Sequence, residues 1–379
     1  MKKYDVAVIG GRLAGLTAAL TLSESGLKTS VFEQNRRIGF PVCCGEAVSK
    51  AALCESGLAV PPFIDKKIQG FRVFMPDGRH FRVNTPGYLV NRGLIEQHLA
   101  KKAVNAGCDI FTGCRVTKIS GIHGSFTVTA GRKTCSAKTV IGADGPLSVT
   151  SKSFFNSSSS YVPAMQYKIN KKPGLYNSRG FIDFYFTPAS GYYFWVFEKK
   201  DEINAGGAVN KNSLDMFIRE KIPGAMKLKK RLTRGLIPLG GMKKSVYKNG
   251  VFLAGDAAGL VNPVSMAGIY TALKSGKLCA SSIAGYFSTG KTEYIKKYPS
   301  LLKKLLLPGF FLRYISRHVY SYPAGVFRFI GDYLDGAEFI REQPIRLFAM
   351  IIKNPSILPH LPPLLAHREY LRFFKNSQW

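Results

Sequence analysis

Residues 4–33 carry the pattern that most constrains the fold of this chain. A mostly apolar stretch, Val6–Ile9, runs into glycines at positions 10, 11 and 15, and a helical pattern follows from Ala14 to Ser25. A second short strand ends in an acid, Glu33, 18 residues beyond the last glycine. This order predicts a βαβ unit whose glycine turn approaches a pyrophosphate and whose acid hydrogen-bonds a ribose hydroxyl. The unpaired N–H groups at the start of the helix would face the phosphates.

One position departs from the G-x-G-x-x-G pattern of such turns, because Arg12 stands where the second glycine belongs. Gly10 and Gly15 keep the tight turn and the close packing of the helix on the strand. Arg12 either crowds the pyrophosphate or contributes its guanidinium to binding it, and the sequence leaves both interpretations open. Taken alone, the motif is also compatible with a βαβ unit that only resembles a nucleotide site.

Composition indicates a globular chain with an unusually basic surface. Its 379 residues suffice for a full core, with 46% hydrophobic and 20% charged residues and a formal net charge of +31. The basic excess is spread along the chain, which favours an anionic partner such as a membrane surface, an acidic protein or nucleic acid. A proteome that is basic throughout would give the same excess.

The sequence predicts a cytoplasmic protein with reduced cysteines. Seven cysteines without a C-x-x-C pair argue against a disulfide framework or a zinc site, so no metal is expected. A first strand that begins at Tyr4 leaves no room for a signal peptide. The longest apolar runs are shorter than the ~18–20 residues that span a bilayer. We therefore expect a monomer that is peripheral to the inner face of the membrane.

Local patterns predict the order of the next elements. A short helix is expected near 47–56, a hairpin at 70–84 around an Asp77-Gly78 turn, and a helix at 92–106. Short strands are then expected at 109–111, 114–119, 125–130 and 139–141.

The second half of the chain is predicted to be rich in strands before helical character returns. Residues 160–248 contain several aromatic strands and one predicted basic helix, and an apolar strand and a helix follow from Gly250 to about Ser288. The basic helix carries Lys227, Lys229, Lys230, Arg231 and Arg234. The return of βα character predicts a discontinuous nucleotide-binding domain.

Three glycine-containing motifs follow one another at fixed spacings. They are the turn with its acid Glu33, GADGPLS at 142–148 and GDAAGLVNP at 255–263. Over roughly residues 1–295 the chain therefore resembles the aromatic-hydroxylase-like class of FAD-dependent oxidoreductases. The resemblance implies an α/β fold, α+β overall, with a Rossmann-like FAD-binding domain, an inserted antiparallel β-sheet substrate domain and a helical C-terminal region.

The expected domain boundaries follow from these motifs. The FAD-binding domain comprises residues 1–69, 88–150 and 250–298, the substrate domain 70–87 and 151–249, and the C-terminal region 299–379. The C-terminal region mixes short apolar runs, prolines and basic residues. This mixture is typical of a helical cap or of a surface that lies on an anionic membrane, and both interpretations stay open.

The resemblance also implies roles for individual residues. Glu33 would bind the adenosine ribose, Arg92 the pyrophosphate side of the flavin and Asp256 the ribityl chain. Asp144 would brace the cofactor domain, and the helix after Asp256 would stabilise negative charge on the reduced flavin. The FAD is expected to be non-covalent. The expected cofactor-binding residues are Gly10, Gly11, Arg12, Ala14, Gly15, Glu33, Gln34, Cys44, Gly45, Arg92, Asp144, Gly255, Asp256, Pro263, Gly268 and Ile269.

Two further stretches resemble geranylgeranyl reductases. PVCCGEAVSKAAL at 41–53 is similar to the proline–cysteine–glycine loop of that family. GYYFWVFEK at 191–199 is similar to its Y-x-W-x-F-P signature, with Glu198 in place of the final proline. The cysteine of the loop, Cys44, is a catalytic candidate beside the flavin, although a small buried hydrophobic role would also suit it.

The aromatic signature also predicts a substrate-binding surface. Strand alternation places Tyr193, Trp195 and Phe197 on one face, where they would line an apolar tunnel for the substrate. Tyr193 and Trp195 are further catalytic candidates, because aromatic faces stabilise positive charge. An ordinary buried sheet face would show the same alternation.

The resemblance implies an FAD-dependent reductase that saturates isolated C=C bonds of geranylgeranyl or other polyprenyl chains in a lipid. The electron donor stays open between NAD(P)H and reduced ferredoxin, an acidic carrier that would suit the basic surface. The alternative is an FAD-dependent monooxygenase that acts on an aromatic or quinone substrate, since such enzymes share all three cofactor motifs. Nucleic-acid binding is not expected, because it offers no role for Glu33 or Asp256.

Overall fold

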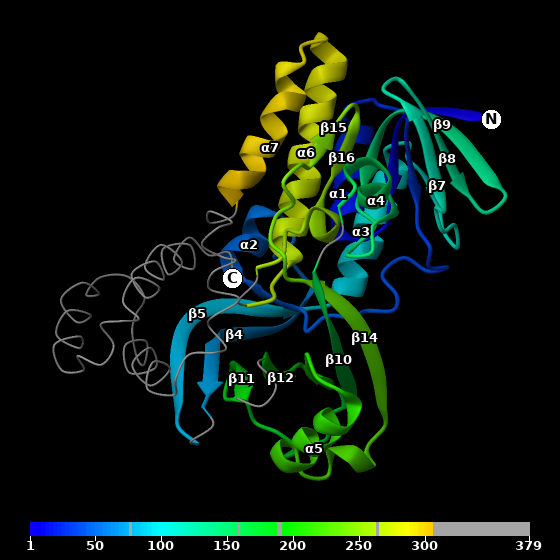
Figure 1. Ribbon diagram of the computed structural model, residues 1–379. Helices are drawn as coiled ribbons and strands as arrows, with labels where there is room; N and C mark the ends of the chain where they lie inside the picture. The colour runs from blue at the N-terminus through cyan, green and yellow to red at the C-terminus, as the bar shows by residue number, and fades with distance from the viewer. Residues whose placement is uncertain (76–77, 158–159, 188–191, 263–264, 306–379) are drawn as a thin grey trace, which may run out of the picture. The chain divides into compact units, whose positions relative to one another are not determined.

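The computed structural model describes residues 1–75, 78–157, 160–187, 192–262 and 265–305 (Figure 1). The described chain divides into two compact units, and each unit combines separate stretches of sequence. Unit 1 comprises residues 1–42, 92–161 and 237–305, and unit 2 comprises residues 43–91 and 162–236. Residues 43–69 thus pack within unit 2, whereas the sequence grouped them with the first glycine motif.

Unit 1 is built on a mainly parallel sheet, as the glycine motif predicts. Its described strands run in the order β15-β16-β9-β1-β2-β6, and the antiparallel strands β7 and β8 continue from β9. The strands are β1 (Lys2–Ile9), β2 (Thr29–Phe32), β6 (Asp109–Phe111), β7 (Lys118–Ile122), β8 (Ser125–Ala130), β9 (Lys133–Gly142), β15 (Tyr247–Lys248) and β16 (Val251–Leu253). Val6, Ala7 and Val8 are fully buried, as expected of a parallel strand that is covered on both faces.

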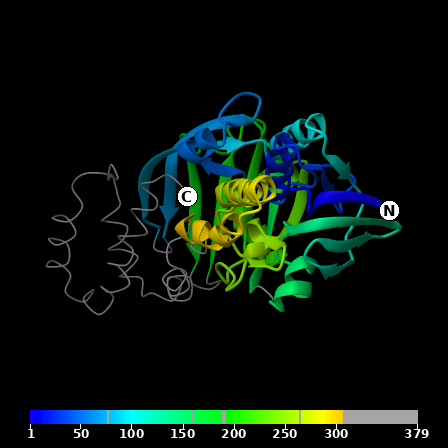
Figure 2. The same cartoon turned by 90° about the horizontal axis from the view of Figure 1, so that it is seen from above.

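Helices pack against this sheet and against one another. They are α1 (Leu13–Glu24), α3 (Arg92–Asn105), α4 (Val149–Phe155), α6 (Ile269–Thr289), α7 (Glu293–Leu305) and the 3₁₀ turn η3 (Gly255–Ala258). The helices α1 and α6 approach closely, since a Cβ atom on Gly276 would lie 2.3 Å from the backbone oxygen of Ala14. The yellow and orange helices α6 and α7 lie side by side (Figure 1, Figure 2).

The expected helix at 92–106 and the expected strand–helix pattern at 250–288 are confirmed. The expected strand at 114–119 is wrong, because β7 begins only at Lys118. Val116 and Ile119 are both buried in the core of unit 1, so the apolar residues of this stretch reflect packing rather than a continuous strand.

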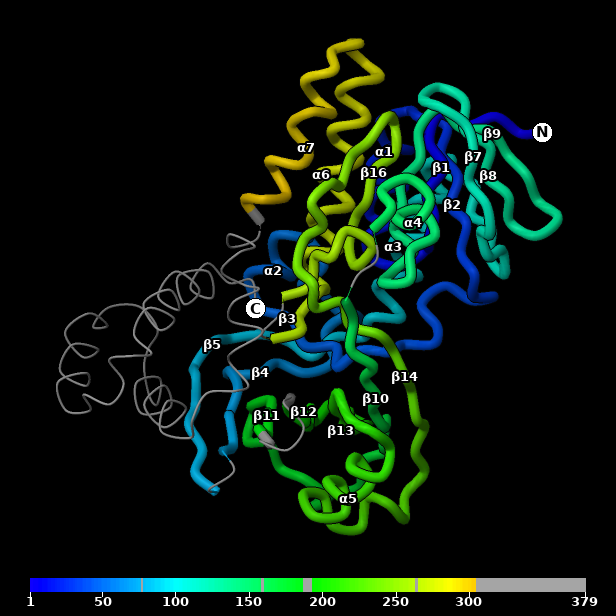
Figure 3. The backbone as a smooth tube through the Cα atoms, viewed as in Figure 1, coloured from blue at the N-terminus to red at the C-terminus, as the bar shows by residue number. Residues whose placement is uncertain are grey.

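Unit 2 is built on one long, mainly antiparallel sheet. The described strands run in the order β14-β10-β13-β12-β11-β4-β5-β3, and β11 and β4 pair in parallel. The strands are β3 (Ala47–Ser49), β4 (Ile64–Phe74), β5 (His80–Val90), β10 (Tyr161–Asn170), β11 (Phe181–Thr187), β12 (Tyr192–Glu198), β13 (Glu202–Gly207) and β14 (Lys230–Pro238). Figure 3 shows β4 and β5 as a long pair, which confirms the predicted hairpin, although Asp77 in its turn lies outside the described residues.

The helix α5 (Lys211–Lys221) covers one face of this sheet. Leu214, Phe217 and Ile218 of α5 pack with Phe194 and Val196 of β12, and the rings of Phe194 and Phe217 stack with centroids 4.2 Å apart. Side chains alternate across a strand, so the neighbouring residues of β12 lie on the opposite face. The remaining helical elements of unit 2 are α2 (Lys50–Glu55) and the short 3₁₀ turn η2 (Ala225–Lys227).

Two sequence-based helix predictions in unit 2 need correction. The segment predicted as a basic helix at 227–234 instead runs through η2 into β14, an edge strand that pairs with β10. Lysine and arginine favour helices only weakly, so strand pairing decides, and basic residues on an edge discourage pairing with other chains. The helix expected near 47–56 begins only at Lys50, after the short strand β3.

None of the helices in the described ranges combines the length and hydropathy needed to cross a membrane. Residues 306–379 contain most of the expected C-terminal region, 299–379, and lie outside the described residues.

Candidate active site

The glycine turn of unit 1 has the close backbone packing that a phosphate-binding turn requires. Gly10 has φ +102°, and a Cβ atom there would lie 2.3 Å from the backbone oxygen of Ala143. A Cβ atom on Gly15 would lie 1.9 Å from the oxygen of Gly10. The turn therefore tolerates only glycine at both positions, and it leads directly into α1.

Glu33 lies buried at the end of β2, next to this turn. Its side chain is 3% exposed, and Oε2 accepts the backbone N–H of Gly11 at 2.7 Å. The other oxygen accepts the backbone and side-chain N–H groups of Asn35 at 2.8 and 2.6 Å. A carboxylate has about four acceptor positions, so this one retains capacity for a ribose hydroxyl. Gln34 follows at an exposed position.

The start of α1 has no side-chain cap. Arg12 is its N-cap residue and makes no side-chain capping bond, and Ala14 lies buried in the first turn. The first N–H groups of a helix have no partner within the helix, so they would be available to a phosphate.

The arginine that replaces the second glycine is held by a carboxylate that sequence reasoning missed. Arg12 Nη1 lies 2.8 Å from Glu96 Oε2, and the guanidinium also donates to the backbone oxygen of Pro41. Arg92 Nε donates to the other oxygen, Glu96 Oε1, at 2.9 Å. Glu96 is fully buried, so a single carboxylate fixes both arginines. The only sequence signal for it was the four-residue spacing from Arg92 along a predicted helix.

Two aspartates follow the strands β9 and β16 of the same sheet. Asp144 accepts hydrogen bonds from the hydroxyl of Ser148 and the backbone N–H of Thr150, so it holds the start of α4. Burial raises its pKa, and the hydrogen bonds from Ser148 and Thr150 offset part of that rise. Burial also raises the pKa of Asp256, in η3, and the positive charge of Arg92 acts in the opposite direction.

The third glycine motif leads from η3 to α6. The backbone N–H of Gly255 donates to Ser275 Oγ at 2.9 Å. Gly268 is the N-cap of α6, with no side-chain capping bond, and Ile269 is the first helical residue. Pro263 lies outside the described residues.

Taken together, these features of unit 1 fit a dinucleotide cofactor. The glycine turn provides backbone without side chains, two helix starts lack side-chain caps, and a buried acid with spare acceptor capacity lies beside the turn. Arginine guanidinium groups match phosphate geometry, so Arg12 and Arg92 add suitable donors.

The predicted aromatic face exists in unit 2. Tyr193, Trp195 and Phe197 lie on the face of β12 opposite α5 and are 5%, 9% and 6% exposed. The ring of Phe184 packs edge-on against Tyr193 and Phe197, with centroids 5.0 and 5.4 Å apart. The rings therefore form a continuous aromatic surface.

Neighbouring glycines allow this surface to form. A Cβ atom on Gly206 would lie 2.4 Å from Trp195 Cζ2, and one on Gly45 would lie 2.5 Å from the ring of Phe197. The cysteine loop thus packs on the aromatic strand, and the two stretches that resembled geranylgeranyl reductases meet within unit 2. Gln166 joins them as well, since it donates to the backbone oxygen of Cys44 at 2.8 Å and accepts from Trp195 Nε1 at 3.2 Å.

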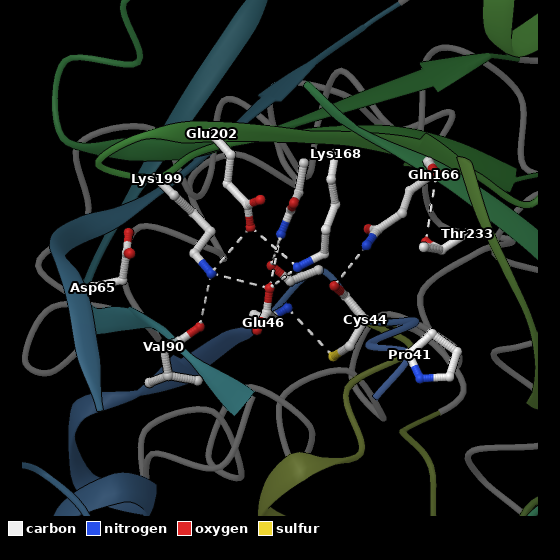
Figure 4. Close-up of polar contacts among 12 residues, drawn as sticks. Pro41, Cys44, Glu46, Asp65, Val90, Gln166, Lys168, Lys199, Glu202 and Thr233 are labelled. Carbon is white, nitrogen blue, oxygen red and sulfur yellow. Dashed lines mark hydrogen bonds and ion pairs between the residues drawn. The ribbon is translucent and has the colours of Figure 1, made fainter. Parts of the chain in front are cut away.

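A cluster of buried charges lies next to Cys44, and sequence reasoning missed it. Glu46 is 1% exposed, and its Oε2 lies 2.6 Å from Lys168 Nζ and 3.0 Å from Lys199 Nζ (Figure 4). Glu202 lies 3.1 Å and 3.4 Å from the same two nitrogens. Burial lowers the pKa of Lys168, but attraction to Glu46 and Glu202 outweighs burial and raises it overall.

The residue that replaces the final proline of the aromatic signature has partners of its own. Glu198 is 5% exposed and lies 2.8 Å from Lys66 Nζ and 2.6 Å from Lys171 Nζ. Ser178 donates to it through both its backbone N–H and its hydroxyl. Burial raises the pKa of Glu198, but the hydrogen bonds from Lys171, Lys66 and Ser178 outweigh burial and hold it at about 2.

Within the described ranges, no three or more His, Cys, Asp or Glu side chains lie together in an arrangement that could hold a metal ion.

Comparisons with known proteins agree with these features. The lycopene cyclase protein family matches residues 5–164. A digeranylgeranylglycerophospholipid reductase from Thermoplasma volcanium is 31% identical over 342 residues, covering 80% of this chain and 84% of the relative. Another, from Methanocella arvoryzae, is 28% identical over 397 residues, covering 96% and 99%.

Solved structures show the same fold. A geranylgeranyl bacteriochlorophyll reductase-like protein from Thermoplasma acidophilum superposes with a TM-score of 0.81 at 26% identity, covering 96% of this chain and 100% of that protein. A probable FAD-dependent monooxygenase from Pseudomonas aeruginosa, at 14% identity, shares the fold alone, with a TM-score of 0.67 over 86% of this chain and 100% of that protein.

The fold and the matched relatives define the class of the protein: it is an FAD-dependent oxidoreductase. Within this class, the chain belongs to the geranylgeranyl reductase family, as its similarity to digeranylgeranylglycerophospholipid reductases over most of both chains shows. The resemblance to geranylgeranyl reductases drawn from the sequence motifs and the predicted mixed α/β fold are confirmed, whereas most of the predicted helical C-terminal region lies outside the described residues.

Proposed function

We propose that this protein saturates isolated C=C bonds in geranylgeranyl or other polyprenyl chains of a lipid. The relatives named digeranylgeranylglycerophospholipid reductase support this substrate class. The observation that carries the proposal is the packing of the cysteine loop on the aromatic face, through Gly45 and Phe197 and through the hydrogen bonds of Gln166.

We assign cofactor binding to residues of unit 1 together with Cys44 and Gly45 of unit 2, and substrate binding to the aromatic face of unit 2. Glu33 would hold the adenosine ribose, Arg92 the pyrophosphate side of the flavin and Asp256 the ribityl chain. The remaining residues expected to bind FAD non-covalently are Gly10, Gly11, Arg12, Ala14, Gly15, Gln34, Cys44, Gly45, Asp144, Gly255, Pro263, Gly268 and Ile269. Bound FAD, once reduced by the electron donor, would supply the hydride, and a separate donor would supply the proton.

The protein has to make an unreactive alkene accept a hydride. An isolated alkene is not electrophilic, so the site must exclude water and tolerate positive charge that develops on carbon. The faces of Trp195 and Tyr193 stabilise such charge without acting as nucleophiles. Cys44, Tyr193 and a water molecule are the candidate proton donors.

The free energy that binds the prenyl chain of the substrate would come from burial of its apolar surface along Tyr193, Trp195 and Phe197. At ~0.8 kcal/mol for each buried methylene, a C20 chain contributes well over ~10 kcal/mol before ordering costs. This energy can hold one double bond at the reacting position.

The experiment that tests the proposal compares two reactions of the reduced protein. Under anaerobic conditions, dithionite-reduced protein should convert a geranylgeranylated lipid to products two hydrogens heavier for each bond saturated. The alternative, an FAD-dependent monooxygenase of an aromatic or quinone, predicts substrate-dependent oxygen consumption and no anaerobic product. That second outcome would replace the proposed function.

We also propose that the basic surface serves either an anionic membrane or an acidic electron carrier. On β14 and the residues just before it, four basic side chains are exposed: Lys227, Lys229, Arg231 and Arg234. An anionic membrane attracts each such residue by about 1 kcal/mol. A reduced ferredoxin would use the same attraction, whereas NAD(P)H would not need it.

A further inference from the structure

Hydrogen bonds to the backbone hold the central part of the cysteine loop, residues Cys44–Glu46. All three of its carbonyl groups accept a hydrogen bond, and the donors come from three strands of unit 2. The donors are, in order, the side-chain amides of Gln166 and Asn204 and the backbone N–H of Val90, at 2.8, 3.1 and 2.9 Å. The loop therefore has little freedom to move within its unit.

Glu46 holds an unusual backbone conformation in this loop. Its φ is +69°, a left-handed value that residues with a side chain rarely adopt. In this conformation, the backbone N–H of Glu46 donates to Cys44 Sγ at 3.3 Å. Backbone strain of this kind persists only where surrounding contacts enforce it.

The carboxylate of Glu46 adds side-chain contacts to these backbone hydrogen bonds. One oxygen, Oε2, accepts from Lys168, Lys199 and Asn204 at 2.6, 3.0 and 3.3 Å (Figure 4). Together with Glu202, these residues form a set of two ammonium and two carboxylate groups with no net charge. Buried charges are costly unless they are well paired, so a cluster of this kind is weak as a stabilising device alone.

We propose that Glu46 is a positioning residue for the Cys44 thiol. Its carboxylate, anchored by Lys168 and Lys199, holds the left-handed backbone that directs the Glu46 N–H at Cys44 Sγ. The inference deepens the proposed function, on which it rests for the role of Cys44 near the reacting alkene. The ion cluster thereby acts on the reaction through the loop.

The first test measures Cys44 without any substrate. The protein is treated briefly with iodoacetamide, and peptide mass spectrometry gives the alkylation rates of Cys44 and of the exposed Cys54, which serves as an internal control. In the Glu46→Gln variant, we expect the ratio of the two rates to change at least threefold. An unchanged ratio overturns the inference.

The second test separates positioning from general stability. For Glu46→Gln we expect kcat to fall at least tenfold, with KM for the prenyl lipid and FAD affinity each within twofold of wild type. Glu46→Gly accepts φ +69° without strain but lacks the anchor, so it should lose the same activity. Full turnover in Glu46→Gly would show that the carboxylate positions nothing.

A double variant covers a failure of Glu46→Gln to fold. Glu46→Gln combined with Lys199→Met removes one ammonium together with the carboxylate, so the cluster stays neutral. We expect this variant to fold and to keep the altered Cys44-to-Cys54 ratio and the low kcat. Restoration of both to wild-type values would mean that Glu46 provides charge balance only.

These tests distinguish the inference from the proposed function. A changed alkylation ratio in a protein that reduces no prenyl lipid would support the positioning of Cys44 and refute the function. An unchanged ratio in an active reductase would refute the positioning alone.

Discussion

Replacing Glu198 by glutamine should remove a pH-dependent part of the stability of unit 2. This residue stands where the family signature has proline, and its buried carboxylate is held by Lys66 and Lys171. Burial raises its pKa, but the hydrogen bonds to the carboxylate lower it from 4.5 to about 2. Because the folded pKa is the lower one, the stabilisation is complete above pH 4.5 and is lost as the pH falls toward 2.

The size of the effect follows from the two pKa values. At about 1.4 kcal/mol per pH unit, the full difference corresponds to roughly 3 kcal/mol. At pH 3 the unfolded chain is almost fully protonated at this site and the folded chain is not, so about 2 kcal/mol has been lost. The side chains of Lys66 and Lys171 are 26% and 25% exposed, and solvent screens such pairs. We therefore expect a loss of about 1–2 kcal/mol between pH 7 and pH 3.

Urea unfolding of both proteins at pH 7, 4 and 3, followed by tryptophan fluorescence, measures this contribution. All other carboxylates are shared, so the difference between the two unfolding free energies isolates Glu198. We expect Glu198→Gln to be less stable at pH 7 and the difference to shrink by about 1–2 kcal/mol at pH 3. A difference that stays constant across this range would refute the reasoning.

Four further predictions address the cofactor, the substrate and the surface. Glu96→Gln should weaken FAD binding about tenfold (about 1.4 kcal/mol), because two guanidinium groups lose their shared carboxylate; an unchanged dissociation constant in a fluorescence titration would contradict this. In the same assay, Arg12→Gly binds FAD less tightly if Arg12 helps to hold the pyrophosphate and more tightly if Arg12 crowds it. Trp195→Ala should slow turnover of long prenyl substrates while the flavin spectrum and dithionite reduction stay normal, and an equal loss of FAD would make Trp195 a core residue only. Reversing Lys227, Lys229, Arg231 and Arg234 to glutamate should abolish either co-sedimentation with anionic liposomes or ferredoxin-dependent flavin reduction; if neither changes, the charge has no role in either.

The glycine turn and the buried acid beside it could be predicted from the sequence because local patterns determine them. A buried parallel strand, the turn at Gly10 and an acid at Glu33 fall within one short βαβ segment, and each position has a physical requirement of its own. The aromatic face was predictable for the same reason, since alternation along one strand decides which side chains lie together.

The ionic contacts could not be predicted in this way. Glu46 meets Lys168 and Lys199 across 122 and 153 residues of sequence, and no local pattern encodes such pairs. The link between Arg12 and Glu96, 84 residues apart, has the same origin. The helix predicted at 227–234 was wrong for a related reason. Pairing of β14 with β10, which is also distant in sequence, outweighed the weak helix preference of the basic residues.

The central claim is that the protein saturates prenyl double bonds, and the most direct measurement is mass spectrometry of lipids from cells that express it. Cells that contain geranylgeranylated lipids should accumulate species whose masses rise in steps of two hydrogens. Cells that express the Trp195→Ala variant should show few of these species. Lipids of unchanged mass in the presence of folded, FAD-containing and reducible wild-type protein would contradict the account. Lipids that gain oxygen instead would identify the protein as a monooxygenase.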